Sequence, residues 1–225
     1  MKAFGKAMLD SLNGNPKTFI MKINNHPIQE DCTVFSEIRE DEKRVLKSVV
    51  REGKINVLDY GCGIGRHFDY LLELNPNIIC HGIEKCELLN DYLREKYPKQ
   101  HSFYLDYLDI LEELRFDAIL FMGNGLGVLG DENAAKARIQ DIVQNRLNDN
   151  GHILFETGNP FGRGYITKRI IIQYNDIVDE PIPWGYADFE WVKKVFEENG
   201  CEIEKKPSFG TGGCWFFAIS KKRNA

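Results

Sequence analysis

Residues 57–67 read Val-Leu-Asp-Tyr-Gly-Cys-Gly-Ile-Gly-Arg-His and give the clearest indication of the fold class. The first of these residues complete a short apolar run that is typical of a buried strand, and the last of them open a segment of helical periodicity. Three glycines lie between the two. Glycines at such a turn let a ligand lie against backbone amides at the positive N-terminus of the helix. The stretch therefore predicts an α/β protein with a ligand site at this turn.

Short apolar runs alternate with helical segments on the C-terminal side of the turn, which is typical of a parallel sheet with crossover helices. The predicted strands are 55–60, 77–83, 102–106, 117–122 and 152–157. Two later runs, 201–206 and 214–220, are separated by too few residues for a crossover helix and should form an antiparallel hairpin. We expect a doubly wound α/β fold with a seven-stranded, mostly parallel sheet. Asn150-Gly151 and Asn199-Gly200 should each end a helix, and a helix before the first strand should run through Val49 and Val50.

The remaining segments are expected to flank this sheet. Residues 1–53 are predicted to form an N-terminal helical or cap segment, and residues 54–225 the ligand-binding domain, with an insertion at 158–185. Eight aromatic side chains lie between residues 155 and 191, which suggests a substrate wall and a lid. The alternative is an extra edge strand containing Ile170, Ile171, Ile172 and Tyr174, with the aromatic side chains in the core.

The glycine spacing distinguishes between nucleotide ligands. A dinucleotide-binding motif needs Gly-x-Gly-x-x-Gly, whereas Arg66 occupies the place of the third glycine and Gly65 comes one residue early. The next predicted strand is followed by Glu84, whose carboxylate can accept hydrogen bonds from both hydroxyls of a ribose. An adenosine-containing ligand other than a dinucleotide is therefore favoured.

The segment Asp59-Tyr60-Gly61-Cys62-Gly63-Ile64-Gly65 resembles the glycine-rich motif of the class I S-adenosylmethionine-dependent methyltransferases. The resemblance extends over about residues 54–220 and includes the terminal hairpin. Within this family, the sequence also resembles small stand-alone bacterial enzymes with unassigned substrates. The resemblance implies a Rossmann-like methyltransferase fold and S-adenosyl-L-methionine as the cofactor. The cofactor-binding positions that it implies are Asp59, Gly61, Gly63 and Gly65 for the methionine portion, Glu84 for the ribose, Asp106 and Tyr107 for the adenine, Met122, Gly123 and Asn124 beside the methyl group, and in addition Cys62 and Lys85.

Methyl transfer is an in-line displacement, so alignment and exclusion of water can supply most of the acceleration. Where a base helps, the candidates are His67 and Glu156, at the carboxyl ends of predicted strands. The alternatives are that His67 bonds its own loop and that Glu156 pairs with Arg163 or Lys168. Asp106 has an alternative role as the cap of a following helix. The Asp/Asn-Pro-Pro-Tyr motif is absent after the fourth strand, which argues against methylation of a base or amide nitrogen.

Composition constrains the partners. The chain of 225 residues has 29 Lys and Arg against 34 Asp and Glu, a net charge of −5, so we expect a small-molecule acceptor rather than nucleic acid or a membrane. Six cysteines lack zinc-ligand spacing, no metal is expected, and most should be buried in a cytoplasmic protein. The oligomeric state is left open. Two rival functions are an NAD(P)-dependent oxidoreductase and a non-catalytic S-adenosylmethionine-binding protein.

Overall fold

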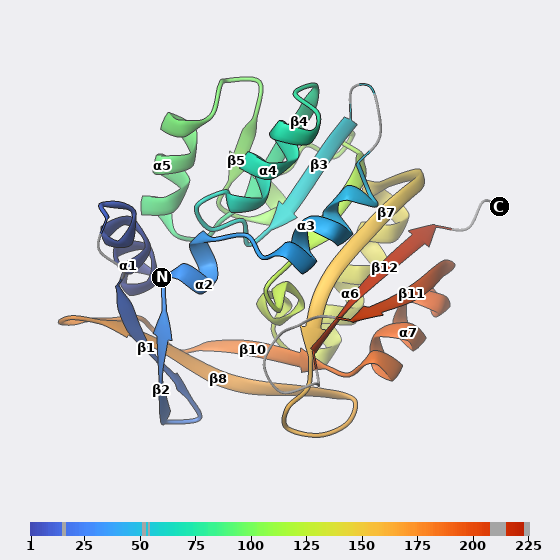
Figure 1. Ribbon diagram of the computed structural model, residues 1–225. Coiled ribbons are helices and arrows are strands. Elements are labelled where there is room, and N and C mark those ends of the chain that lie inside the picture. The colour runs from blue at the N-terminus through green and yellow to red at the C-terminus, as the bar shows by residue number, and fades with distance from the viewer. Residues whose placement is uncertain (15–16, 51–52, 54, 208–214, 223–225) are drawn as a thin grey trace.

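The computed structural model describes residues 1–14, 17–50, 53, 55–207 and 215–222 (Figure 1). Its main sheet has seven strands in the order β11-β12-β7-β6-β3-β4-β5. The strands are β3 (Ile55–Tyr60), β4 (Ile78–Ile83), β5 (Ser102–Tyr104), β6 (Phe116–Phe121), β7 (Leu147–Gly158), β11 (Cys201–Pro207) and β12 (Trp215–Lys222). All seven predicted strands are present, so the predicted sheet is confirmed.

The strand directions also agree with the prediction. β3, β4, β5, β6 and β7 run parallel, whereas β12 runs antiparallel to both β7 and β11. The order of the strands reverses at β3, which has β4 on one side and β6 on the other. In open α/β sheets, ligands bind in the crevice beyond the carboxyl ends of the strands at such a reversal. The glycine turn follows β3 directly.

Helices cover both faces of the main sheet, as expected of a doubly wound fold. Buried side chains of α3 (Glu40–Lys47), α4 (Arg66–Leu74) and α5 (Glu87–Lys96) share one core with the sheet, and those of α6 (Glu132–Asp141) and α7 (Phe189–Glu198) share another. The shorter helical turns are α2 (Thr33–Ser36), η1 (Tyr107–Asp109), η2 (Gly125–Leu129) and η3 (Ile142–Arg146).

Two predicted helix ends differ from the structure. The helix predicted to stop at Asn150-Gly151 ends before Leu147, because Leu147 pairs with Phe116 as the first residue of β7. The helix predicted through Val49 and Val50 ends at Lys47. By contrast, α7 ends at Asn199 and Gly200, as predicted, and Gly200 has a positive φ of 78°.

A second sheet lies outside the predicted fold. It has the order β10-β8-β1-β2, with β9 paired to β8. Its strands are β1 (Thr18–Ile23), β2 (His26–Asp31), β8 (Tyr165–Tyr174), β9 (Ile177–Val178) and β10 (Ile182–Ala187), and the helix α1 (Lys2–Leu12) packs on it. The expectation that residues 1–53 are helical is therefore wrong over β1 and β2. These strands form because β1 pairs with β8 of the insertion.

The insertion is built mainly of strands of this second sheet. The strand alternative for Ile170, Ile171, Ile172 and Tyr174 is the one observed, although β8 is an interior strand and not an edge strand. The second sheet contacts the main sheet beyond the carboxyl end of β3. In Figure 1 the arrowhead of β3 points toward this side of the molecule. Trp184 of β10 there packs against Gly127 of η2 so closely that a side chain at 127 would overlap its ring.

Candidate functional site

The glycine turn is held in a shape that needs glycine. Gly61, Gly63 and Gly65 have φ values of 78°, 56° and 81°, in the left-handed region that other residues rarely adopt. Gly65 also packs against the Tyr97 ring, and a Cβ there would lie 2.7 Å from the Tyr97 hydroxyl. A Cβ on Gly63 would meet no atom within 4 Å. The turn is thus packed at Gly65 and open at Gly63, as a ligand cradle requires.

Glu84 is the first residue after β4, and its carboxylate is hydrogen-bonded to the open glycine, Gly63. Its Oε2 accepts the Gly63 N–H at 3.1 Å and its Oε1 accepts the Cys86 N–H at 2.8 Å. Burial disfavours the charged carboxylate and raises the pKa of Glu84 to about 7, despite these two hydrogen bonds. The predicted neighbours differ in exposure, because Cys62 is buried whereas Lys85 is exposed. The structure therefore brings Glu84 to the glycine turn and leaves Lys85 at the surface.

Asp59 and His67 form a buried pair on the other side of the turn. His67 Nδ1 lies 2.8 Å from Asp59 Oδ2, so the polar partner of His67 is a residue of β3. Burial alone would lower the pKa of His67, but the Asp59 and Glu42 carboxylates outweigh burial and raise it. The buried Asp59 Oδ1 and His67 Nε2 have no hydrogen-bond partner among the described residues. A buried carboxylate oxygen without a donor is suited to a ligand cation.

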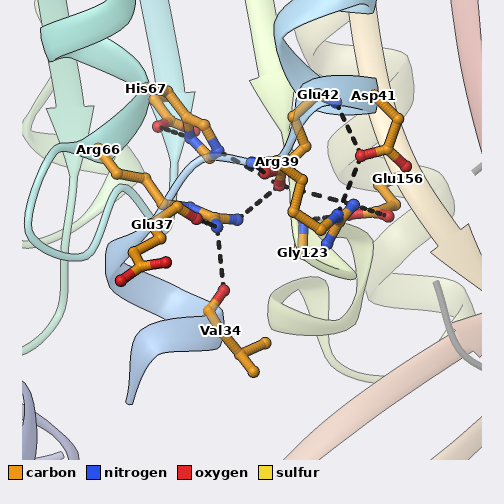
Figure 2. A network of polar contacts seen from close by, with 10 residues as sticks. Val34, Glu37, Arg39, Asp41, Glu42, Arg66, His67, Gly123 and Glu156 are labelled. Atoms are coloured by element: carbon orange, nitrogen blue, oxygen red, sulfur yellow. Dashed lines mark hydrogen bonds and ion pairs between the residues drawn. The ribbon is translucent and has the colours of Figure 1, made fainter. Parts of the chain in front are cut away.

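Residues 34–42 belong to the predicted cap segment, and Arg66 ties them to the glycine turn (Figure 2). Its guanidinium donates to the carbonyl oxygens of Val34 at 2.9 Å and Glu37 at 2.5 Å, and to Glu42 Oε1 at 2.6 Å. Burial favours protonated Glu42, but the neighbouring His67 and Arg66 lower its pKa to about 2. Arg66 thus stands where a dinucleotide-binding motif has its third glycine, and its side chain forms a structural ion pair with Glu42.

Glu156 is reached from the same N-terminal segment. Its Oε1 lies 2.5 Å from Arg39 Nη2, and its Oε2 accepts the Gly123 N–H at 3.2 Å (Figure 2). Glu156 is therefore in an ion pair, as the alternative predicted, but its partner is Arg39 and not Arg163 or Lys168. The ion pair joins α3 to the carboxyl ends of β6 and β7. Arg39 was not foreseen because it is 117 residues from Glu156 in the chain.

The loop after β6 is held from two sides. Asn124 adopts a left-handed φ of 60°, accepts the Thr157 hydroxyl at 2.9 Å and donates to the Gly185 carbonyl at 3.2 Å. Met122 is buried beside it. The second sheet therefore fixes this loop through β10. The structure brings Met122, Gly123 and Asn124 to the same edge of the sheet as the glycine turn.

Asp106 and Tyr107 follow β5 and have structural partners. Asp106 accepts the Leu108 N–H at 3.1 Å and caps η1, so the capping alternative is observed. Tyr107 is buried, stacks on Tyr60 and donates to Asp141 Oδ2 at 2.5 Å. These contacts position the loop after β5 and leave Tyr107 inside the core.

The sequence pattern around Glu42 could have identified it as a buried, paired carboxylate. It precedes Val45 by three residues and Leu46 by four, so all three side chains lie on one face of α3. A carboxylate on an apolar helix face is costly unless it is paired, and so indicates a buried partner. Nothing local indicates that this partner is Arg66.

The state of the cysteines and the absence of membrane-spanning helices are two general features of the described residues. Cys32, Cys62, Cys80, Cys86 and Cys201 are free and buried, and Cys214 lies outside the described residues. Within the part of the chain that the structure describes, no helix has both the length and the apolar character to cross a bilayer.

No family model matches the sequence, and no curated protein matches it. Solved structures do. A Bacteroides fragilis S-adenosylmethionine-dependent methyltransferase in complex with S-adenosyl-L-homocysteine is similar with a TM-score of 0.80 at 18% identity, over 99% of this chain and 95% of its own. An amino pentose methyltransferase of Micromonospora echinaspora gives a TM-score of 0.58 at 16% identity, over 81% of this chain and 89% of its own.

A third structure agrees with these two. The CcbJ methyltransferase of Streptomyces caelestis gives a TM-score of 0.61 at 16% identity, over 80% of this chain and 94% of its own. The first of the three spans nearly the whole chain, including both sheets, whereas the others cover about four fifths of it. This chain therefore has the Rossmann-like fold of the class I S-adenosylmethionine-dependent methyltransferases.

Proposed function

We propose that this protein is an S-adenosyl-L-methionine-dependent methyltransferase that acts on a small-molecule acceptor in the cytoplasm. The observation that carries the proposal is the glycine turn after β3, which is open at Gly63 and has the Glu84 carboxylate bonded to the Gly63 amide. An adenosine ligand placed there finds backbone amides, an acceptor for ribose hydroxyls and an unpartnered Asp59 oxygen for an ammonium group. Each of these groups matches a part of the cofactor.

The residues of the chain have distinct roles in this proposal. Asp59, Gly61, Cys62, Gly63 and Gly65 hold the methionine portion, Glu84 holds the ribose, and Asp106 and Tyr107 shape the adenine end. When bound, the cofactor supplies an activated methyl group on a sulfonium sulfur. Met122, Gly123 and Asn124 border the methyl, and the second sheet holds this loop in place from one side.

A small-molecule acceptor is supported by the net charge of −5, which gives no general attraction to nucleic acid. It is supported as well by the similar structures, one of which is an amino pentose methyltransferase. The oxidoreductase alternative loses support, since the buried Arg66 guanidinium lies where a dinucleotide site needs its third glycine.

Calorimetric titration tests the proposal. We expect the wild-type protein to bind S-adenosylmethionine and S-adenosylhomocysteine with a dissociation constant on the order of 1 μM, about −8 kcal/mol. Gly63→Arg should abolish binding because its side chain enters the open cradle. Gly200→Arg is the matched control, because Gly200 also has a positive φ with open space around it but caps α7.

The outcomes separate the alternatives. Loss of binding in both glycine variants would indicate backbone strain and not an occupied cradle. Absence of binding of either ligand to folded wild-type protein, with quenching of NADH fluorescence instead, would replace the methyltransferase by the oxidoreductase. Binding retained only in Gly200→Arg supports the proposed site and justifies a screen of acceptors.

A further inference from the structure

Glu156 is a buried carboxylate placed at the edge where the proposed methyl transfer takes place. β6 and β7 are parallel neighbours, so Phe121 and Phe155 pair and the residues after them emerge side by side. Glu156 Oε2 accepts the N–H of Gly123, in the loop that borders the methyl group in the proposed function. The carboxylate is therefore anchored to that loop by one oxygen, and its other oxygen is held by a side chain.

That side chain, Arg39, is more exposed than the three carboxylates around it. Its Nη2 lies 2.5 Å from Glu156 Oε1, its Nε lies 3.1 Å from Asp41 Oδ1, and Nη2 lies 3.7 Å from Glu42 Oε1. The Arg39 side chain is 35% exposed, whereas the carboxylates of Asp41, Glu42 and Glu156 are 4%, 0% and 3% exposed. Arg39 can therefore turn away from Glu156 and retain two carboxylates, whereas Glu156 cannot follow it.

The carboxylates of Asp41, Glu42 and Glu156 outnumber the guanidiniums of Arg39 and Arg66, the second of which pairs with Glu42 at 2.6 Å, and these carboxylates also select the charge of an incoming group. A carboxylate or phosphate on the acceptor would be repelled by them, while an ammonium group would take the place of Arg39 at Glu156 with a charge-assisted hydrogen bond. Figure 2 shows the Glu156 carboxylate beside the Arg39 guanidinium, with Asp41 on the same side as Glu156 and with Arg66 and His67 on the far side of Arg39.

We propose that Glu156 is the acceptor-binding residue of this protein and that the acceptor is an amine, with Arg39 as its exchangeable counter-ion; this rests on the proposed function. The arriving ammonium transfers one proton to Glu156, so one N–H bond breaks and one O–H bond forms. The freed nitrogen pair then forms the N–C bond to the methyl carbon. The C–S bond breaks with its electron pair on sulfur, which leaves a methylated ammonium and a neutral thioether.

Sinefungin provides a binding test that needs no identified acceptor. This analogue carries a primary amine on the carbon that replaces the methylated sulfur, whereas S-adenosylhomocysteine has neither amine nor methyl there. We expect the wild-type protein to prefer sinefungin over S-adenosylhomocysteine by about tenfold, or about 1.4 kcal/mol. Glu156→Gln should reduce this preference to within about twofold, and Glu197→Gln, an exposed carboxylate on α7, should preserve it.

A second variant tests the role of Arg39 from the other direction. Arg39→Met removes the counter-ion and should increase the sinefungin preference severalfold, because Glu156 then loses its competing cation. An unchanged preference in both Glu156→Gln and Arg39→Met would overturn the inference while the cofactor site stands. Failure of the folded wild-type protein to bind either compound would overturn the proposed function itself.

Discussion

The two sheets of this protein assemble by different routes. In the main sheet, β3, β4, β5, β6 and β7 follow one another along the chain, each joined to the next by a helical connection. In the second sheet, β1 pairs with β8, so that Ile20 lies opposite Gln173 from the far half of the chain. The main sheet builds the proposed cofactor cradle, and the second sheet holds its loops in place.

The contact between them explains how this division works. Ile64 of the glycine turn and Leu89 of α5 share a buried cluster with Phe4 of α1, Phe19 of β1 and Ile170 of β8. The cradle therefore rests on side chains that belong to the second sheet. A site can take its chemistry from one sheet and its rigidity from the other.

The largest expected effect is in the main core. Phe155 is fully buried and stacks on Phe196 at 5.0 Å, so Phe155→Ala should lower the free energy of unfolding by about 4 kcal/mol. Urea denaturation measures this loss. Leu108→Ala is the control, because Leu108 is 78% exposed and its removal should change stability by less than about 0.5 kcal/mol.

A somewhat smaller effect is expected in the second sheet. Ile170→Ala should cost about 3 kcal/mol, whereas Ile177→Ala on the exposed strand β9 should cost much less. Because the shared cluster links the two sheets, unfolding should remain a single transition by tryptophan fluorescence and by far-ultraviolet circular dichroism. Separate transitions would show that the second sheet is an independent unit.

A pH effect is expected only at the main-sheet cradle. Burial raises the pKa of Glu84 to about 7, and ribose hydroxyls donate to its ionised form. Cofactor affinity should therefore increase as pH rises through 7, and be about tenfold weaker at pH 6 than at pH 8. Calorimetry at both pH values checks this change. A Glu84→Gln protein that kept the same pH slope would contradict it.

The smallest effect compares two helix caps. Asp131 caps α6 from the adjoining residue through the Ala134 N–H, while Asp179 of the insertion caps α1 through the Ala3 N–H at 3.0 Å. Each Asp→Ala substitution should cost about 1 kcal/mol in thermal or urea unfolding. Glu180→Ala, exposed beside Asp179, should be nearly neutral. A negligible loss for Asp179→Ala alone would show that α1 docks without this cap.

The two candidate bases illustrate how far the sequence reaches into the site. Glu156 and His67 were identified because each follows a recognisable strand or turn, and the structure places both in buried polar networks. Their partners Arg39 and Glu42 lie in a segment whose position no local pattern specifies. The expected partners of Glu156, Arg163 and Lys168, are near it in sequence, but the actual partner is near it only in space.

Local patterns were enough to predict the seven strands of the main sheet, the antiparallel hairpin, the glycine turn and the position of Glu84, because each depends on periodicity or spacing over a few residues. Tertiary structure alone decided the second sheet, the docking of residues 34–42 onto Arg66, and the Arg39–Glu156 pair. These features depend on strand pairing and charge pairing between segments that are distant in the chain. Such pairs are stabilised by burial in the folded protein, so they leave no local pattern in the sequence.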